Sequence, residues 1–236
     1  MTYKLLDQFR GLFEGKQYMH RNSTLGDHVA SFLFEDLHDL GKSAKLSAGI
    51  CAKTHALNRG NRRVGLSARR GDGTFGEVVP GEPTLSVPGV SVAIAEVATI
   101  EIGAEVKILA KAMIKQIDRV CTDMLNQISE FKRHGGSPIC VGIAGVNWAK
   151  AYTSYEGEAV WPTDGRKRKH PVQEAADAEG RLLARVAPHF DAFIFLNFKA
   201  SNTPPTFDFS WVDQKKTEKL YGASLVRISR EYEKRF

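Results

Sequence analysis

Cysteine and long apolar runs are scarce in this chain of 236 residues. The three cysteines, Cys51, Cys121 and Cys140, are widely spaced and form no Cys-x-x-Cys pair, which argues against a disulfide framework and a structural zinc site. We expect reduced thiols in the core. No run of 18 or more apolar residues occurs, and residues 1–10 lack the apolar segment of a signal peptide, so we predict a cytoplasmic protein that does not cross a membrane.

The short motifs of several large enzyme classes are also missing. The seven histidines never stand in the His-Glu-x-x-His spacing of zinc proteases. Neither a Gly-x-x-x-x-Gly-Lys phosphate loop nor the Gly-x-Ser-x-Gly turn of serine hydrolases occurs. Because each of these chemistries needs its residues at those spacings, the sequence favours none of the three.

The charge balance is basic. Lysine and arginine number 33 against 27 acidic residues, which gives a net charge of +6 and favours a polyanionic partner without requiring one. Two segments concentrate the positive charge, one between Arg59 and Arg70 and one from Arg166 to His170. We interpret them either as phosphate-binding loops or as ordinary solvated loops.

Apolar spacing predicts one α/β (α+β) domain over residues 1–236. Helical periodicity appears in four segments, residues 25–40, 111–134, 173–186 and 215–234. Continuous apolar runs predict two buried strands, residues 138–146 and 190–198. Residues 71–89, rich in glycine and proline, are expected to form a loop with one short strand, and residues 90–109 a hairpin. We therefore expect a central mixed β-sheet flanked by helices.

The most informative stretch is the apolar run that contains Glu105-Val106-Lys107 and leads into a long amphipathic helix. Side chains two apart on a strand point to the same side, roughly 6 to 7 Å from each other, so Glu105 and Lys107 would stand together. Their neighbours are apolar, which indicates that the opposite face of the strand is buried. An acid and a base held stiffly beside a core favour a metal site.

Three other acid-x-Lys triplets begin at Glu14, Glu130 and Asp213. The triplet therefore occurs often by chance, and only the sequence around each of the four triplets can distinguish a site from a coincidence. Glu130 falls in a predicted helix, where side chains two apart diverge, and the other two lack apolar strand neighbours. Only Glu105 lies in an apolar β run. The alternative interpretation is an exposed edge-strand face or a structural ion pair.

The Glu105-x-Lys107 pair on a central strand, the following helix with Gln116 and the buried strand after it resemble the core of the PD-(D/E)XK nuclease superfamily, which has the restriction-endonuclease-like fold. The resemblance covers about residues 25–146 and leaves a C-terminal helix-strand-helix extension over about residues 147–236. It implies that Glu105 binds a divalent metal ion, Mg²⁺ or Mn²⁺, and that Lys107 assists the attacking water.

The family places a first acid, commonly after proline, at the start of the strand that pairs with the Glu-x-Lys strand, and this chain has no Pro-Asp dipeptide. Three acids are candidates, Asp72, Glu82 and Glu96. Asp72 lies between two glycines in a loop that could reach the end of a sheet, whereas Glu96 is only nine residues ahead of Glu105. We choose Asp72. The predicted metal ligands are then Asp72 and Glu105, and the predicted catalytic residues are Asp72, Glu105 and Lys107.

Other polar residues near these elements have less specific interpretations. Glu35 and Asp36 lie on or beside the apolar stripe of the first helix. Either one of them faces the proposed site or both are surface acids, and we favour surface acids. Eight basic residues are predicted to contact nucleic acid: Arg69, Arg70, Lys111, Lys115, Arg166, Lys167, Arg168 and Lys169. Such basic stripes are also typical of solvated faces.

Together these features predict a Mg²⁺-dependent DNA endonuclease of the kind found in restriction or other defence systems. Phosphodiester hydrolysis needs charge neutralisation at the phosphate and an activated water, and a cation held by hard oxygen ligands supplies both. Because two DNA strands need two sites, the resemblance also implies a homodimer. The alternative is a non-catalytic nucleic-acid-binding or interaction protein of the same fold, which the missing Pro-Asp favours.

Overall fold

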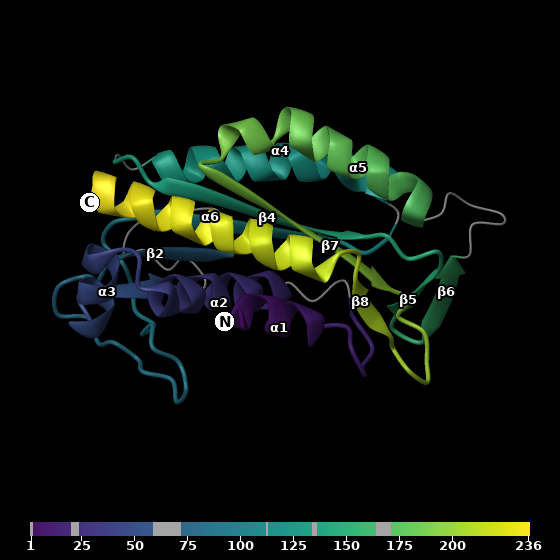
Figure 1. Cartoon of the computed structure of the whole chain (residues 1–236), viewed down its shortest axis with the longest axis horizontal. Coiled ribbons are helices and arrows are strands. Elements are labelled where there is room, and N and C mark those ends of the chain that lie inside the picture. The colour runs from purple at the N-terminus through teal and green to yellow at the C-terminus, as the bar shows by residue number, and fades with distance from the viewer. Residues whose placement is uncertain (1, 20–23, 59–71, 112, 134–135, 164–170) are drawn as a thin grey trace.

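The computed structural model describes residues 2–19, 24–58, 72–111, 113–133, 136–163 and 171–236. In them, a six-stranded mixed sheet with the order β1-β2-β3-β4-β7-β8 forms the centre of an α/β fold (Figure 1). Its strands are β1 (His55–Asn58), β2 (Gly73–Glu77), β3 (Ile102–Leu109), β4 (Ile139–Asn147), β7 (Ala192–Ala200) and β8 (Phe209–Trp211). The central strands β3, β4 and β7 run parallel, and the outer pairs are antiparallel. The predicted class and the mixed sheet are confirmed.

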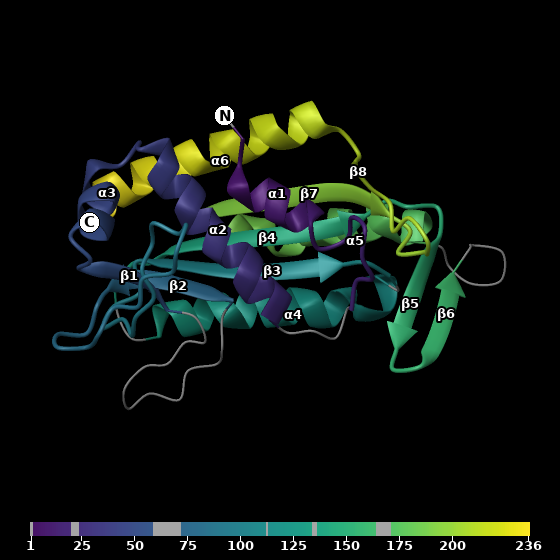
Figure 2. The ribbon, with the colours of Figure 1, turned by 90° about the horizontal axis from the view of Figure 1, so that it is seen from below.

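Helices cover both faces of the sheet (Figure 1). One side carries α1 (Lys4–Arg10), α2 (Thr24–Leu40), α3 (Ala44–Cys51) and α6 (Gln214–Arg235). The other side carries α4 (Met113–Lys132) and α5 (Pro171–Arg185), and a short 3-10 helix, Ala187–His189, leads into β7. The hairpin of β5 (Tyr152–Glu156) and β6 (Ala159–Thr163) forms a separate two-stranded sheet beyond the end of β3 (Figure 2).

Each helical layer builds its own hydrophobic core. On the α2 side, Leu33 and Phe34 are buried in one cluster with Phe75 of β2. On the α4 side, Met124 of α4 is buried with Leu182 of α5. Because β4 lies between the two layers, all nine of its residues are buried, which explains the continuous apolar run in its sequence.

The predicted helices and buried strands lie close to their expected bounds. α2, α4, α5 and α6 cover the four predicted helical segments, and β4 and β7 cover the two predicted buried strands. β7 pairs parallel with β4, so the C-terminal part of the chain contributes a strand to the central sheet.

The hairpin expected over residues 90–109 is wrong. β3 begins only at Ile102, and its antiparallel partner is β2. In the segment before β3, Ile94 makes only single bridges to two other segments, while Val92 and Val97 are buried without joining a named strand. Apolar residues that are buried under connections give the same pattern as a strand, which is why the periodicity misleads here.

The interpretation of Glu35 and Asp36 as surface acids is also wrong, because both are buried. Asp36 accepts hydrogen bonds from the backbone N–H groups of Lys4 and Leu5, at 2.8 and 3.0 Å, and from the hydroxyl of Tyr221. The first N–H groups of a helix have no partner inside it, so Asp36 stabilises the start of α1. Glu35 accepts two backbone N–H groups of the segment before β3. Both carboxylates therefore stabilise the fold.

Two of the three free cysteines, Cys121 and Cys140, are buried as expected, whereas Cys51 is exposed at the end of α3. Burial raises the pKa of Cys140 to about 11, which suppresses thiolate chemistry at this residue. Of the helices in the described ranges, none combines the length and the apolar character needed to cross a membrane.

Candidate active site

Asp72 lies immediately before the first residue of β2, at the point where β3 continues beyond its pairing with β2. β2 pairs antiparallel with the first part of β3, and Gly73 stands opposite Ala104. One residue further, the same register sets Asp72 opposite Glu105. β3 runs on to Leu109, and within the described residues this second half has no strand partner on that side. Asp72 therefore stands at the point where β2 stops pairing with β3.

A backbone hydrogen bond holds Asp72 in place. Its Oδ2 accepts the N–H of Val106 at 2.7 Å, a group that points to the side where β2 has ended. On the side of α2, Gly26 comes so close that a Cβ there would lie 2.5 Å from Oδ1 of Asp72. Gly26 thus leaves the room that the carboxylate needs, and α2 and β3 together determine its position.

Glu105 and Lys107 project from the same face of β3, as alternate residues on a strand must. The Nζ of Lys107 lies 2.5 Å from Oε1 of Glu105, and the Glu105 side chain is only 5% exposed. The other oxygen, Oε2 of Glu105, is buried and has no hydrogen-bond partner among the described residues. A buried carboxylate oxygen without a partner is unfavourable, so this atom is suited to binding a cation.

Negative charge dominates the surroundings of Glu105. Its pKa is raised to about 7, mainly by burial and then by the charge of Asp72, while the charge of Lys107 acts to lower it. Asp123 of α4 adds to the negative field. For Lys107, burial lowers the pKa, but the charges of Glu105 and Asp72 outweigh this and raise it. One ammonium group thus balances several carboxylates.

The donor set suits a hard divalent cation. Asp72 and Glu105 offer carboxylate oxygens, which are the ligands that Mg²⁺ and Mn²⁺ prefer. A cation bound there would give Oε2 of Glu105 the partner that it lacks among the described residues, and it would relieve the repulsion between the two acids. The residues present therefore fit the metal that the sequence predicts.

The other acids considered for the first position lie elsewhere. Glu82 and Glu96 belong to segments at the far end of β2, where the N–H of Val79 bonds to the carbonyl of Glu96. All of β2 separates them from Asp72. Gln116, the polar residue expected on the helix after β3, is exposed on α4. The structure thus brings Asp72, and neither Glu82 nor Glu96, to the Glu-x-Lys strand.

Sequence reasoning does not reveal two residues of this site. Asp123 is one of three acids on α4, and its only signal is its place directly before Met124 of the apolar stripe. Gly26 is one of 21 glycines, and only its close approach to Asp72 distinguishes it. Both depend on contacts between elements that are far apart in the chain.

The predicted nucleic-acid contacts are only partly covered by the structure. Lys111 forms an ion pair with Glu156 of β5, in which Nζ lies 3.7 Å from Oε1. Lys115 is exposed on the first turn of α4. The remaining predicted contacts lie outside the described residues: Arg69, Arg70, Arg166, Lys167, Arg168 and Lys169. Lys115 is therefore the described basic residue of this set that is best placed to meet a polyanion.

No protein-family model, no curated protein and no solved structure matches the chain. Any assignment of function therefore has to rest on the residues around Asp72, Glu105 and Lys107 and on the order of the elements that carry them.

Proposed function

We propose that this protein is a Mg²⁺-dependent endonuclease that hydrolyses phosphodiester bonds of DNA. The observation that carries the proposal is the meeting of three residues at one strand edge. Asp72, held by the N–H of Val106, lies opposite Glu105, whose carboxylate pairs with Lys107. Two carboxylates and an ammonium group in this arrangement match the needs of metal-assisted hydrolysis.

The order and pairing of the elements support a restriction-endonuclease-like core. After α2 and the short α3, the strands β1, β2 and β3 pair antiparallel in sequence, and α4 then leads to β4, which pairs parallel with β3. Asp72 stands at the start of the strand that pairs with the Glu-x-Lys strand, as in the PD-(D/E)XK pattern. The chain departs from that pattern by having Gly71 where proline is common.

Lys107 acts in the proposed reaction as a protonated group. Held between Asp72 and Glu105, a divalent cation would supply charge neutralisation at the phosphate and a lowered pKa for a water molecule. The ammonium group of Lys107 can donate a hydrogen bond to the attacking water or to a phosphate oxygen and so stabilise the developing negative charge. The water oxygen forms the new bond to phosphorus, the P–O bond to the leaving strand breaks, and that strand's oxygen takes up a proton.

Plasmid cleavage tests the proposal. We expect supercoiled DNA to be cut with Mg²⁺ and to stay intact with EDTA, and we expect Asp72→Asn and Glu105→Gln to abolish cutting. Glu82→Gln is the matched control, because it removes an exposed carboxylate at the far end of β2. If wild-type protein cuts neither plasmid nor single-stranded DNA in Mg²⁺ or Mn²⁺, the proposal is wrong.

A non-catalytic nucleic-acid-binding protein is the second candidate. The direct ion pair of 2.5 Å between Lys107 and Glu105 favours it, because buried pairs of this kind also occur as structural elements. In that case DNA should bind equally well in Mg²⁺ and in EDTA, and no strand should be cut. Mobility-shift and cleavage assays on the same samples distinguish the two candidates.

A further inference from the structure

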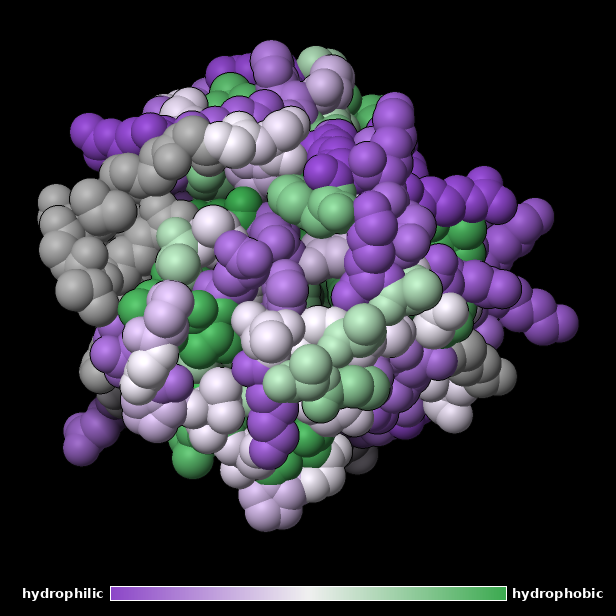
Figure 3. All heavy atoms as spheres, turned by 90° about the vertical axis from the view of Figure 1, so that its left-hand side faces the viewer, coloured by the Kyte–Doolittle hydropathy of each residue, from purple (hydrophilic) through white to green (hydrophobic). Residues whose placement is uncertain are grey.

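A cavity of about 660 Å³ opens at the other end of β2 from Asp72. Its walls come from the ends of β1 and β2, the segment before β3 and the last turn of α6. Figure 3 faces this end of the molecule, and hydrophilic residues gather in the middle of the face. Three of the lining residues, His55, Glu77 and Glu101, carry groups that can ligate a metal ion.

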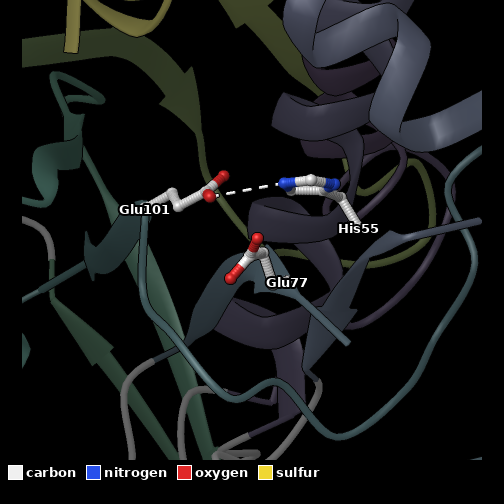
Figure 4. A group of neighbouring side chains, drawn as sticks. All are labelled: His55, Glu77 and Glu101. Carbon is white, nitrogen blue, oxygen red and sulfur yellow. Dashed lines mark hydrogen bonds and ion pairs between the residues drawn. The ribbon is translucent and has the colours of Figure 1, made fainter. Parts of the chain in front are cut away.

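Strand pairing brings these three residues together. His55 of β1 and Glu77 of β2 are register partners, so their side chains share one face of the sheet. The N–H of Glu101 bonds to the carbonyl of Phe75 at 2.9 Å, which sets Glu101 beside the end of β2. One ligand atom of each lies within 4.8 Å of the others, and the imidazole and the two carboxylates converge (Figure 4).

His55 makes one contact through each ring nitrogen. Nδ1 lies 3.0 Å from Oγ1 of Thr54, and Nε2 lies 3.3 Å from Oε1 of Glu101. The hydroxyl of Thr54 also lies 3.3 Å from the carbonyl of Gly49, and when it donates there, Nδ1 carries the ring proton and Nε2 is the free nitrogen that a metal ion needs. The contact between Nε2 and Glu101 is thus bridged either by a proton or by a metal ion.

A further side chain orients the carboxylate. The hydroxyl of Tyr232, on α6, donates to Oε2 of Glu101, which leaves Oε1 directed toward His55. His55 and Glu101 are thus each held by a residue outside the set of three, Thr54 and Tyr232. Metal-ligating imidazoles and carboxylates are typically fixed by outer partners of this kind.

We infer that His55, Glu77 and Glu101 bind one divalent transition-metal ion, for which Zn²⁺ is the best match. One imidazole nitrogen with two carboxylate oxygens suits Zn²⁺, whereas Mg²⁺ prefers oxygen ligands alone. Three protein ligands leave at least one coordination position for water or an exogenous ligand. The cavity in front of the three side chains offers the room for it.

This site is separate from the proposed nuclease centre. β2 from Gly73 to Glu77 lies between Asp72 and the cavity, which at about 3.3 Å per residue puts Asp72 roughly 16 Å from Glu77. Paired catalytic metal ions lie only about 3.5 to 4 Å apart. The inferred Zn²⁺ is therefore not the second ion of a two-metal nuclease, and its presence does not depend on the nuclease proposal.

Isothermal titration of Zn²⁺ into metal-free protein tests the inference without any measurement of activity. We expect one Zn²⁺ ion per chain in Glu105→Gln, in which the proposed nuclease centre has lost a ligand, and the same site in wild type and in the exposed-acid control Glu82→Gln. His55→Ala should weaken binding by about 100-fold or more and Glu77→Gln by at least about tenfold, and Tyr232→Phe, which removes only an outer partner, by about tenfold. Replacing Zn²⁺ by Co²⁺ should give visible absorption bands that disappear in His55→Ala.

Glu77→Gln keeps the inference falsifiable even if His55→Ala does not fold, because Glu77 is exposed and its replacement should leave the far-ultraviolet circular dichroism spectrum unchanged. No heat of binding in wild type would show that a proton occupies the contact between His55 and Glu101, and would overturn the inference. Equal Zn²⁺ affinity in wild type and Glu77→Gln, or loss of binding in Glu105→Gln, would overturn it as well.

Discussion

The two ends of β2 carry two groups of ionisable side chains that are assembled in different ways. The Asp72 cluster consists of Asp72, Glu105 and Lys107, and the His55 cluster consists of His55, Glu77 and Glu101. Two members of the Asp72 cluster are alternate residues of one strand, and the third faces them across a strand pair. The members of the His55 cluster come from three separate segments.

This difference determines what each cluster can bind and how easily it is recognised. The Asp72 cluster has oxygen ligands beside an ammonium group where β2 stops pairing with β3, an arrangement suited to Mg²⁺ and a phosphate. The His55 cluster adds an imidazole and borders a cavity, an arrangement suited to Zn²⁺. The Asp72 cluster can be recognised from a local sequence motif, whereas the His55 cluster becomes visible only from the strand register.

The largest expected effect separates the two clusters by activity. Glu105→Gln removes a proposed metal ligand, so cleavage of plasmid in Mg²⁺ should fall on the order of 1,000-fold or more. Glu77→Gln alters only the other cluster and should cut at the wild-type rate. Initial rates at saturating Mg²⁺ measure both. Similar losses in the two variants would mean that the clusters do not act separately.

The pKa of Glu105 predicts a pH-dependent stability of the metal-free protein. Burial, and then the charge of Asp72, raises this pKa from 4.5 to about 7, so the folded state holds the proton more tightly than the unfolded chain. The stabilising contribution is complete below pH 4.5 and is lost as the pH rises through 7. Relative to Glu105→Gln, the free energy of unfolding of wild type should therefore fall by about 3 kcal/mol over that range.

Urea denaturation in EDTA at several pH values measures this difference. All other titrating groups are shared by the two proteins, so the difference reports Glu105 together with its coupling to Lys107. Glu82→Gln serves as the control and should follow wild type. A constant difference between wild type and Glu105→Gln from pH 4.5 to 7.5 would contradict the raised pKa.

Gly26→Ala tests how Asp72 is positioned. An added Cβ would lie 2.5 Å from Oδ1 of Asp72, so the carboxylate must move, and displacements near 1 Å cost up to about 100-fold in rate. We expect roughly a tenfold loss of cleavage. Gly180→Ala on α5 is the matched control, because nothing lies within 4 Å of its added Cβ. Both substitutions favour helix formation, so a loss in Gly26→Ala alone reflects the site and not an unfolded helix.

Local patterns predict the elements of this fold better than their pairing. Glu105 and Lys107 were predictable as a pair, because residues two positions apart on a strand point to the same side. Their partner strand β2 was not predictable, because it is only five residues long and the apolar segment with Val92 and Val97 has the pattern of a strand. Asp72 was identified as a candidate from its glycine neighbours, but its hydrogen bond to Val106 depends on where β2 ends.

Buried acids are the other feature that local patterns miss. From their positions beside the apolar stripe of the first predicted helix, Glu35 and Asp36 were interpreted as surface acids, whereas their burial follows from backbone N–H groups of distant segments that need acceptors. Glu101 is likewise buried, beside Tyr232 of α6, 131 positions along the chain. Contacts of this separation become predictable only once the sheet order is known.

The smallest expected effect concerns the direction from which DNA approaches. Lys115 is exposed on the first turn of α4, which follows β3 and so lies toward the Asp72 cluster, whereas Lys45 lines the cavity of the His55 cluster. If a DNA strand reaches the Asp72 cluster, Lys115 should contact a phosphate and Lys45 should not. Each phosphate contact adds about 0.9 to the slope of log affinity against log salt on B-DNA.

Fluorescence anisotropy of labelled DNA at several KCl concentrations measures these slopes, with Glu105→Gln as the background so that no strand is cut. Lys115→Gln should reduce the slope by about 0.9 and weaken binding only a few-fold. Lys45→Gln, which also removes one positive charge, should leave the slope unchanged. Because both variants change the net charge equally, a reduction in both would reflect overall charge, and DNA would then show no preference for the end of β2 at which we place the nuclease centre.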